Sequence, residues 1–183
     1  MKLNVLETAE KPWYSDGLTF TCTQCGNCCT GGPGYVWISD VEIKRLAEHL
    51  KLPRKVVLER YCRKIGNKIS LKESRSPAGL YDCVFLKEIP VAGAAAKDKS
   101  KVVQTRRICE IYPVRPLQCR TFPFWDGILA SPQQWKEASK RCPGMDRGSR
   151  KFTREQIEKY RDAEDWPENP PSSAPKKIAP RNK

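Results

Sequence analysis

The stretch FTCTQCGNCCTGGPG, residues 20–34, decides how this chain folds. It holds Cys22, Cys25, Cys28 and Cys29, four of the nine cysteines, within eight residues. Three of them repeat as C-x-x-C-x-x-C, and the fourth follows at once. Packing does not explain this density, because thiolates so close together either bind metal or form disulfides.

Whether these cysteines bind metal or form disulfides depends on the redox state of the cellular compartment. Nine cysteines cannot all pair, because nine is an odd number. The N-terminal MKLNVLETAE lacks the basic, apolar and small-residue order of a secretory signal, and no apolar run is long enough to cross a bilayer. In a reducing compartment dense cysteines are ligands more often than bridges. We therefore predict metal binding without membrane association, in the cytoplasm or, alternatively, in the matrix of a mitochondrion or plastid.

Length and composition predict one domain with a modest core. The 183 residues are 39% hydrophobic and include 15 prolines, so metal staples would help the core to stay folded. We expect a small irregular α+β fold, metal-stapled, with short helices around a cysteine-rich loop core. The predicted parts are an extended N-terminal lead-in (1–19), a cysteine-rich metal-binding domain (20–165) with a surface insertion at about 87–107, and a Pro-rich flexible tail (166–183).

Local start signals predict four helices. Ser39 and Glu42 have the form of a capping box, and Pro53, Ser131 and Thr153 mark three further helix starts. The predicted helices cover about 40–50, 53–64, 131–141 and 153–164. Short strands are expected at 18–22, 69–71 and 83–86. The prolines of residues 107–125 exclude a long regular helix there.

Eight cysteines remain when Cys62 is set aside, which is two sets of four. Cys62 ends the second predicted helix with no cysteine near it in sequence, so we interpret it as a buried small hydrophobe. His49, the only histidine, is interpreted as a surface residue. The predicted metal ligands are Cys22, Cys25, Cys28, Cys29, Cys83, Cys109, Cys119 and Cys142.

Four thiolates suit one tetrahedral Zn²⁺ or one 4Fe–4S cluster, so we predict two four-cysteine metal sites. In ferredoxins a C-x-x-C-x-x-C run feeds three corners of a cubane and a more distant Cys-Pro supplies the fourth, and Cys142-Pro143 is such a pair. This pattern slightly favours 4Fe–4S over zinc.

Adjacent side chains on an extended backbone diverge, which predicts that Cys28 and Cys29 serve different sites. The predicted division places Cys22, Cys25 and Cys28 with one distal cysteine, and Cys29 with the remaining distal cysteines. Bridging arrangements stay open.

Two arginines flank Cys119. Arg115 and Arg120 are predicted to act on the cofactor from outside the ligand set, because guanidinium groups lower thiol pKa values and offset cluster charge. The alternative is that they tie loop carbonyls together. The two interpretations are compatible.

The charge of the chain is strongly positive. The formal net charge is +13; eight thiolates lower it to 13 − 8 = +5, and two Zn²⁺ ions would restore it to +9. Residues 41–70 carry +6 of the formal charge, as nine Lys and Arg against three Glu. Such a patch suits an acidic partner, including RNA or a ribonucleoprotein, and the alternative is a solvated helix face.

The cysteine blocks resemble a known family. FTCTQCGNCC, YDCVFL, CEIYPVRPLQCRTFPFW and CPG, in this order, resemble the YkgJ-like, or CxxCxxCC, family of zinc- or iron-chelating proteins. The resemblance covers roughly residues 11–160. It implies metal ligands at the eight positions given above and includes Arg115-Pro116 and Arg120. The 87–107 insertion, Cys62 and the Pro-rich tail depart from the family pattern without removing a ligand.

Three functions remain open. The first is a metal-binding protein, structural or electron-carrying. The second is a basic ribonucleoprotein or ribosome-associated component whose metal sites are structural and whose region 41–70 and tail face RNA; a protein partner is also compatible. The third is a methyltransferase-like or redox enzyme, although the chain has no Gly-rich dinucleotide-type loop. We predict no catalytic residues, and the lack of a His/Asp/Ser set argues against hydrolysis.

Overall fold

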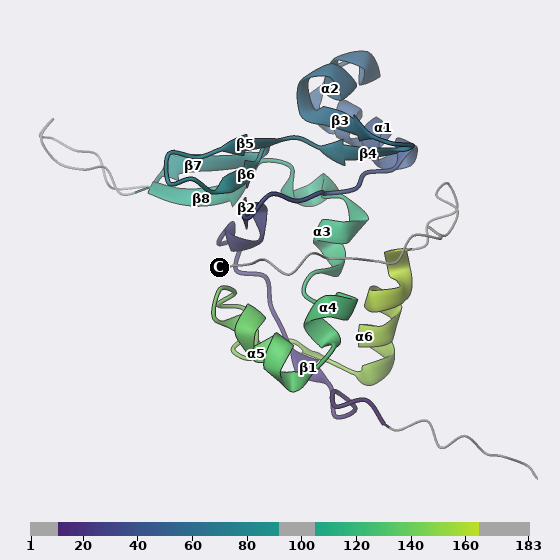
Figure 1. Cartoon of the computed structure of the whole chain (residues 1–183), viewed down its shortest axis with the longest axis vertical. Helices are drawn as coiled ribbons and strands as arrows, with labels where there is room; N and C mark the ends of the chain where they lie inside the picture. Colours follow the sequence, from purple (N-terminus) through teal and green to yellow (C-terminus); the bar gives the residue numbers. More distant parts are fainter. Residues whose placement is uncertain (1–10, 92–104, 165–183) are drawn as a thin grey trace, which may run out of the picture.

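The computed structural model describes residues 11–91 and 105–164. Residues 1–10, 92–104 and 165–183 lie outside the described part, and they include the predicted tail and most of the predicted insertion. The fold is small and mixed α and β, as predicted, and its short elements lie in two halves (Figure 1). In the described part of the chain, no helix is long and apolar enough to span a membrane.

The first half contains two helices and several short antiparallel strand pairs. Helix α1 begins after a complete capping box, in which Ser39 accepts from the Glu42 amide and Glu42 accepts from the Ser39 amide. Strand β3 pairs with β4, β6 lies between β2 and β5, and β7 pairs with β8. The elements are α1 (Asp40–Leu50), α2 (Arg54–Tyr61), β2 (Thr30–Gly31), β3 (Cys62–Ile65), β4 (Lys68–Leu71), β5 (Glu73–Arg75), β6 (Tyr81–Cys83), β7 (Leu86–Pro90) and β8 (Thr105–Cys109).

The second half joins the two ends of the described chain. Strand β1 (Leu18–Thr19) pairs with β9 (Lys151–Phe152), and three helices pack beside this pair. These helices are α4 (Asp126–Leu129), α5 (Pro132–Ser139) and α6 (Arg154–Arg161), followed by the 3₁₀ turn η3 (Asp162–Glu164). Helix α3 (Leu117–Thr121) lies between the halves, and two more 3₁₀ turns are η1 (Asn27–Cys29) and η2 (Tyr112–Val114).

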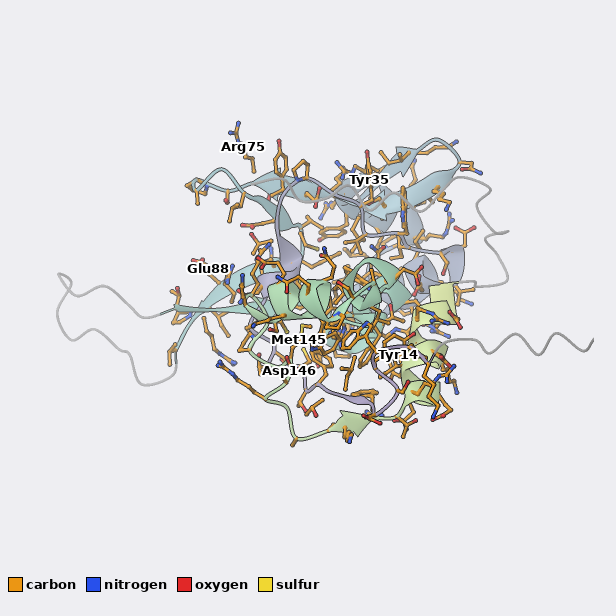
Figure 2. The ribbon with its side chains drawn as sticks, turned by 60° about the horizontal axis from the view of Figure 1, so that its bottom comes forward. Tyr14, Tyr35, Arg75, Glu88, Met145 and Asp146 are labelled. Atoms are coloured by element: carbon orange, nitrogen blue, oxygen red, sulfur yellow. The ribbon has the colours of Figure 1, made fainter. Side chains whose placement is uncertain are left out.

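Each half has its own hydrophobic core. The aliphatic core of the first half consists of Ile38, Ile43, Leu46, Ala47, Val57, Cys62, Leu71, Phe85 and Ile111. The aromatic core of the second half consists of Tyr14, Leu18, Phe124, Leu129, Trp135, Met145, Phe152 and Ile157. Figure 2 shows Tyr14 and Met145 inside the second half, whereas Arg75 points outward on the far side of the molecule. In the predicted lead-in, Tyr14 belongs to the aromatic core and Trp13 packs against it.

Three of the predicted helices match with small changes, and the second is shorter than predicted. Helix α2 stops at Tyr61 instead of continuing to residue 64, because Cys62–Ile65 turns back on Lys68–Leu71 through the two-residue loop Gly66-Asn67. Cys62 therefore belongs to a strand and not to a helix end, although its burial, with 5% of its surface exposed, confirms the predicted role in the core.

Two other boundaries differ from prediction. Residues 83–86 do not form one strand: β6 ends at Cys83 and β7 begins at Leu86, because Phe85 turns inward into the aliphatic core. The two ends of the predicted insertion at 87–107 form strands: Leu86–Pro90 is β7 and Thr105–Cys109 is β8. Lys87 pairs with Ile108 and Pro90 with Thr105, so β7 and β8 form an antiparallel pair around the residues outside the described part.

Candidate metal centre

All eight predicted ligands line one cavity between the two cores. The cavity measures about 80 Å³, which is several times the roughly 10–15 Å³ that one water needs. Cys83 and Cys109 also pack against the aliphatic core, and Cys142 packs against the aromatic core. The cavity is therefore the joint between the halves. The cysteines that line it are Cys22, Cys25, Cys28, Cys29, Cys83, Cys109, Cys119 and Cys142.

Five separate segments bring these cysteines together. The loop 22–29 and η1 supply four of them. Cys83 ends β6, Cys109 ends β8, Cys119 lies in the short helix α3, and Cys142 follows α5. Because the ligands come from segments so distant in sequence, a bound metal would tie most of the fold to one point.

Asn27 fastens the cysteine loop to both halves. Its side-chain oxygen accepts from Arg107 on β8, and its amide nitrogen donates to the carbonyl of Arg141, 2.7 Å away and next to Cys142. Arg141 in turn donates to the carbonyl of Thr30, 3.0 Å away. These neutral and charged hydrogen bonds position the loop without using any cysteine.

Close backbone packing requires glycine beside the loop. A Cβ atom added to Gly144 would lie 2.0 Å from the Thr21 carbonyl oxygen. Gly26 has φ of +73°, and a Cβ there would lie 2.8 Å from the Leu86 side chain. Larger residues at either position would push the two walls of the cavity apart.

The cysteines fall into two groups of neighbours. Cys83 and Cys109 interact with each other and with both Cys29 and Cys119, and Cys142 interacts with Cys25. Cys22 lies against the hydroxyl of Tyr112. Cys28 is exposed and reaches both groups; its Sγ lies 3.8 Å from the Sγ of Cys29.

Four of the cavity thiols have raised pKa values, which favours their neutral form: Cys29, Cys83, Cys119 and Cys142. Burial raises the pKa of the Cys83 thiol to about 11 and also raises the pKa of Cys119 and Cys142. The pKa of Cys29 is raised by its interaction with Cys109, whose own pKa is lowered by the same interaction. Metal binding must therefore displace protons, and a cation in the cavity is what stabilises eight thiolates together.

Arg115 and Arg120 line the cavity and also fasten its loop. Arg115 donates from Nε to the Tyr112 carbonyl at 3.0 Å, with its guanidinium 3.7 Å from the Tyr112 ring centre. Arg120 donates from Nε to the Arg115 carbonyl at 3.0 Å. Arg115 lies close enough to Cys109 and Cys119 to favour their thiolates. The two arginine side chains therefore donate hydrogen bonds to backbone carbonyls and also place positive charge beside the cavity.

The donor set fits a soft or borderline metal. The cavity offers thiols and two arginines, and no histidine or carboxylate lines it. Within the described residues, no three Cys, His, Asp or Glu side chains are already gathered tightly enough to hold one ion. The sulfurs surround an open space instead of meeting at a point.

The sequence did not predict that Tyr112 belongs to the site. Tyr112 lines the cavity beside Cys22, and its position three residues after Cys109 was the available signal. Of the nearby aromatic residues, Phe122 lines the cavity, whereas Phe124 belongs to the aromatic core and Trp125 donates to the Gln118 carbonyl. His49 is exposed on α1, as predicted, and does not line the cavity.

Comparison with known proteins agrees with this site. The model of the family "CxxCxxCC: Putative zinc- or iron-chelating domain" matches residues 21–143. The chain belongs to this family. It is also 32% identical over 111 residues to an uncharacterized protein of Methanocaldococcus jannaschii, covering 61% of this chain and 48% of that protein. The chain thus spans about half the length of this curated relative. No solved structure matches the chain significantly.

Proposed function

We propose that this member of the CxxCxxCC family holds two metal centres in the cavity between its cores and that their role is structural. The observation that carries the proposal is the convergence of eight cysteines from five segments on one cavity that separates two small cores. Structural metal contributes on the order of 10–16 kcal/mol of apparent binding free energy, against about 5–15 kcal/mol for the net stability of a typical domain.

The neighbour groups suggest how the ligands divide. One centre takes Cys29, Cys83, Cys109 and Cys119, in which Cys83 and Cys109 interact with both of the others. The other takes Cys22, Cys25, Cys28 and Cys142. The contact of 3.8 Å between the sulfurs of Cys28 and Cys29 is then the meeting point of the two centres.

We propose iron–sulfur clusters over zinc for these centres. A tetrahedral zinc site with Zn–S bonds of about 2.3 Å places its sulfurs about 3.8 Å apart. The Cys28 and Cys29 sulfurs have this spacing, but the described residues contain no group of three ligands placed to hold one ion, and the eight thiols surround a cavity. A cluster binds each cysteine through a different iron, which suits sulfurs spread around a space, and the C-x-x-C-x-x-C spacing supports the same choice.

Anaerobic purification with metal analysis and visible absorption tests this proposal. We expect a coloured protein with iron and acid-labile sulfide, and variants Cys109→Ser and Cys25→Ser that each lose about half of the metal. Cys62→Ser is the matched control, because Cys62 is buried in the aliphatic core and does not line the cavity. A colourless protein with two zinc ions would overturn the choice of cluster, and full metal content in both ligand variants would overturn the site itself.

A second candidate function is that of a basic ribonucleoprotein component. The segment 35–38 runs beside β4, with Trp37 bridged to Ser70, and the outer face of this small sheet carries two aromatic rings and two cations. Tyr35, half exposed, stacks on Trp37 with ring centres 5.0 Å apart. Arg63 lies over Tyr35 and Lys68 over Trp37. Aromatic rings among cations suit single-stranded RNA.

RNA binding by this face is tested with the double variant Tyr35→Ala/Trp37→Ala. We expect salt-sensitive binding of a short single-stranded RNA by the wild-type chain and at least tenfold weaker binding by the variant. Arg54→Gln, a charge change elsewhere in the basic region, is the control. Equal loss in both variants would show that binding depends on charge alone and would contradict a stacking face.

A further inference from the structure

A second cavity lies next to the metal centre and is lined by three arginines. It measures about 110 Å³ and is bounded by Glu42 and Arg45 of α1 and by Pro113, Val114, Arg115 and Arg120. We call it the arginine pocket. Arg115 and Arg120 line both cavities, so they form the wall between the arginine pocket and the cysteines.

Among the described residues, Glu42 is the one acidic residue that lines this pocket, and its carboxylate is already engaged. Glu42 is buried and accepts, through one carboxylate oxygen, from the amide and hydroxyl of Ser39 at 2.9 and 3.1 Å. Its other oxygen accepts from the amide of Leu117 at 2.6 Å and lies 3.6 Å from Arg120. Glu42 therefore balances one guanidinium while it holds α1 to α3. Three arginines against one glutamate leave the pocket with a net charge of +2.

The three guanidinium groups have N–H donors that their hydrogen bonds to the described residues do not use. Arg115 and Arg120 spend their ε-nitrogens on backbone carbonyls, which fixes the direction of both guanidinium groups. The Arg45 side chain forms no hydrogen bond or ion pair with any residue in the described part of the chain, whereas its backbone belongs to α1. Structural arginines usually find carboxylates, and the acids nearby are too few to serve three of them.

We propose that the arginine pocket binds a tetrahedral oxyanion of the phosphate type between Arg45, Arg115 and Arg120. Guanidinium groups match phosphate oxygens in pairs, and three of them converging from two segments suit a ligand with several oxygens. A free phosphate or phosphomonoester carries about −1.5 to −2 charges near neutral pH, close to the +2 of the pocket lining, whereas a backbone phosphodiester carries −1. The cavity, several times the volume one water requires, has room for the group.

Two sources share this chemistry: free phosphate and a phosphate of a polynucleotide backbone. The pocket lies on α1, within the basic region 41–70, so either source is attracted to it. The proposal does not depend on which metal fills the cysteine cavity, because none of the three arginines is a metal ligand.

The test is a titration of the metal-loaded full chain with inorganic phosphate at 150 mM NaCl, read by calorimetry or by backbone chemical shifts. Arg45→Gln is the deciding variant. Arg45 is exposed and touches no cysteine, so its loss leaves the fold and the metal content unchanged. Lys44→Gln is the matched control, because it removes the same charge from the neighbouring exposed position of α1.

We expect saturable phosphate binding that Arg45→Gln weakens about tenfold and Lys44→Gln weakens less than twofold. A second arm repeats the titration with a short single-stranded RNA. If Arg45→Gln weakens RNA and phosphate alike, the ligand is a backbone phosphate; if RNA binding is unchanged, the ligand is free phosphate. No saturation, or equal losses in both variants, would overturn the oxyanion site. Metal content measured in the same samples separates this failure from failure of the metal centre.

Discussion

The aliphatic core and the aromatic core differ in how far apart in sequence their residues lie. Residues of the aliphatic core all lie between Ile38 and Ile111, and helices α1 and α2 follow one another directly within that stretch. The aromatic core joins Tyr14 and Leu18 to residues from Phe124 to Ile157. Between its parts the chain passes through every one of the eight cavity cysteines except Cys142, which comes after Phe124.

We infer from this difference that folding of the second half depends more on a bound metal than folding of the first half. Closing a long loop costs more conformational entropy than closing a short one, and the aromatic core closes a loop of more than a hundred residues between Leu18 and Phe152. In the proposed division of ligands, one metal centre would join Cys22, Cys25 and Cys28 to Cys142 and so close that loop in advance. The aliphatic core has shorter loops to close.

Metal removal has the largest expected effect. Losing about 10 kcal/mol or more of binding free energy is expected to unfold the second half and to leave residual structure around α1 and α2. Near-UV circular dichroism should collapse because Trp13 and Trp135 lose their fixed contacts, and far-UV signal should fall. Hydrogen exchange in verified metal-free protein should be faster for α6 than for α1. Equal protection of the two helices, or an unchanged melt, would contradict the contrast.

Truncation of the large aromatic residue in each core comes next. Phe124→Ala and Phe85→Ala should each cost about 3–5 kcal/mol, because both side chains are buried. Phe124 should lie at the upper end, since its ring contacts those of Phe20, Trp135, Phe152 and Tyr160, whereas Phe85 contacts Tyr61. Thermal unfolding of the metal-loaded variants gives the two costs. A larger loss for Phe85→Ala would reverse the comparison.

Alkaline pH should weaken the aliphatic core through Cys62. Burial raises the pKa of its thiol from 9.0 to about 11, so the folded state prefers the neutral thiol. The corresponding stability is present below pH 9 and is lost as pH rises through 11, which amounts to about 2 to 3 kcal/mol. Unfolding of metal-loaded wild type and of Cys62→Ala, compared between pH 8 and 11, isolates this effect because the other titrating groups are shared. Parallel stability curves would mean that Cys62 does not titrate in this way.

The helix caps give the smallest effect. Ser39→Ala should cost about 1–2 kcal/mol and Thr153→Ala about 0.5–1 kcal/mol, although both residues start capping boxes. The difference arises because the Ser39 box is buried and its Glu42 also holds the Leu117 amide, whereas Thr153 is exposed. Chemical denaturation at neutral pH measures both. Equal costs would show that the link through Glu42 contributes little.

Local signals in the sequence predicted the helices well and only some of the strands: those expected at 18–22 and 69–71 overlap β1 (Leu18–Thr19) and β4 (Lys68–Leu71). The capping residues Ser39, Ser131 and Thr153 start helices in the structure because a side-chain hydrogen bond to a nearby amide needs no distant partner. The strand β3 was missed, since the run from Val57 to Ile65 has helical spacing and only pairing with Lys68–Leu71 makes its end extended. The pairing of β7 with β8 was not predicted, because residues 87–107 show no periodic pattern of hydrophobic residues.

By itself, the sequence determined the chemistry of this protein: eight cysteines in four blocks, a single exposed histidine, two arginines beside Cys119 and a family of zinc- or iron-chelating domains. Thiol chemistry depends on residue type and spacing, which are written in the chain. The tertiary structure alone shows that the eight thiols line one cavity and that Arg115 and Arg120 form a wall with a second cavity behind them. These facts depend on contacts between segments far apart in sequence, and no local pattern records such contacts.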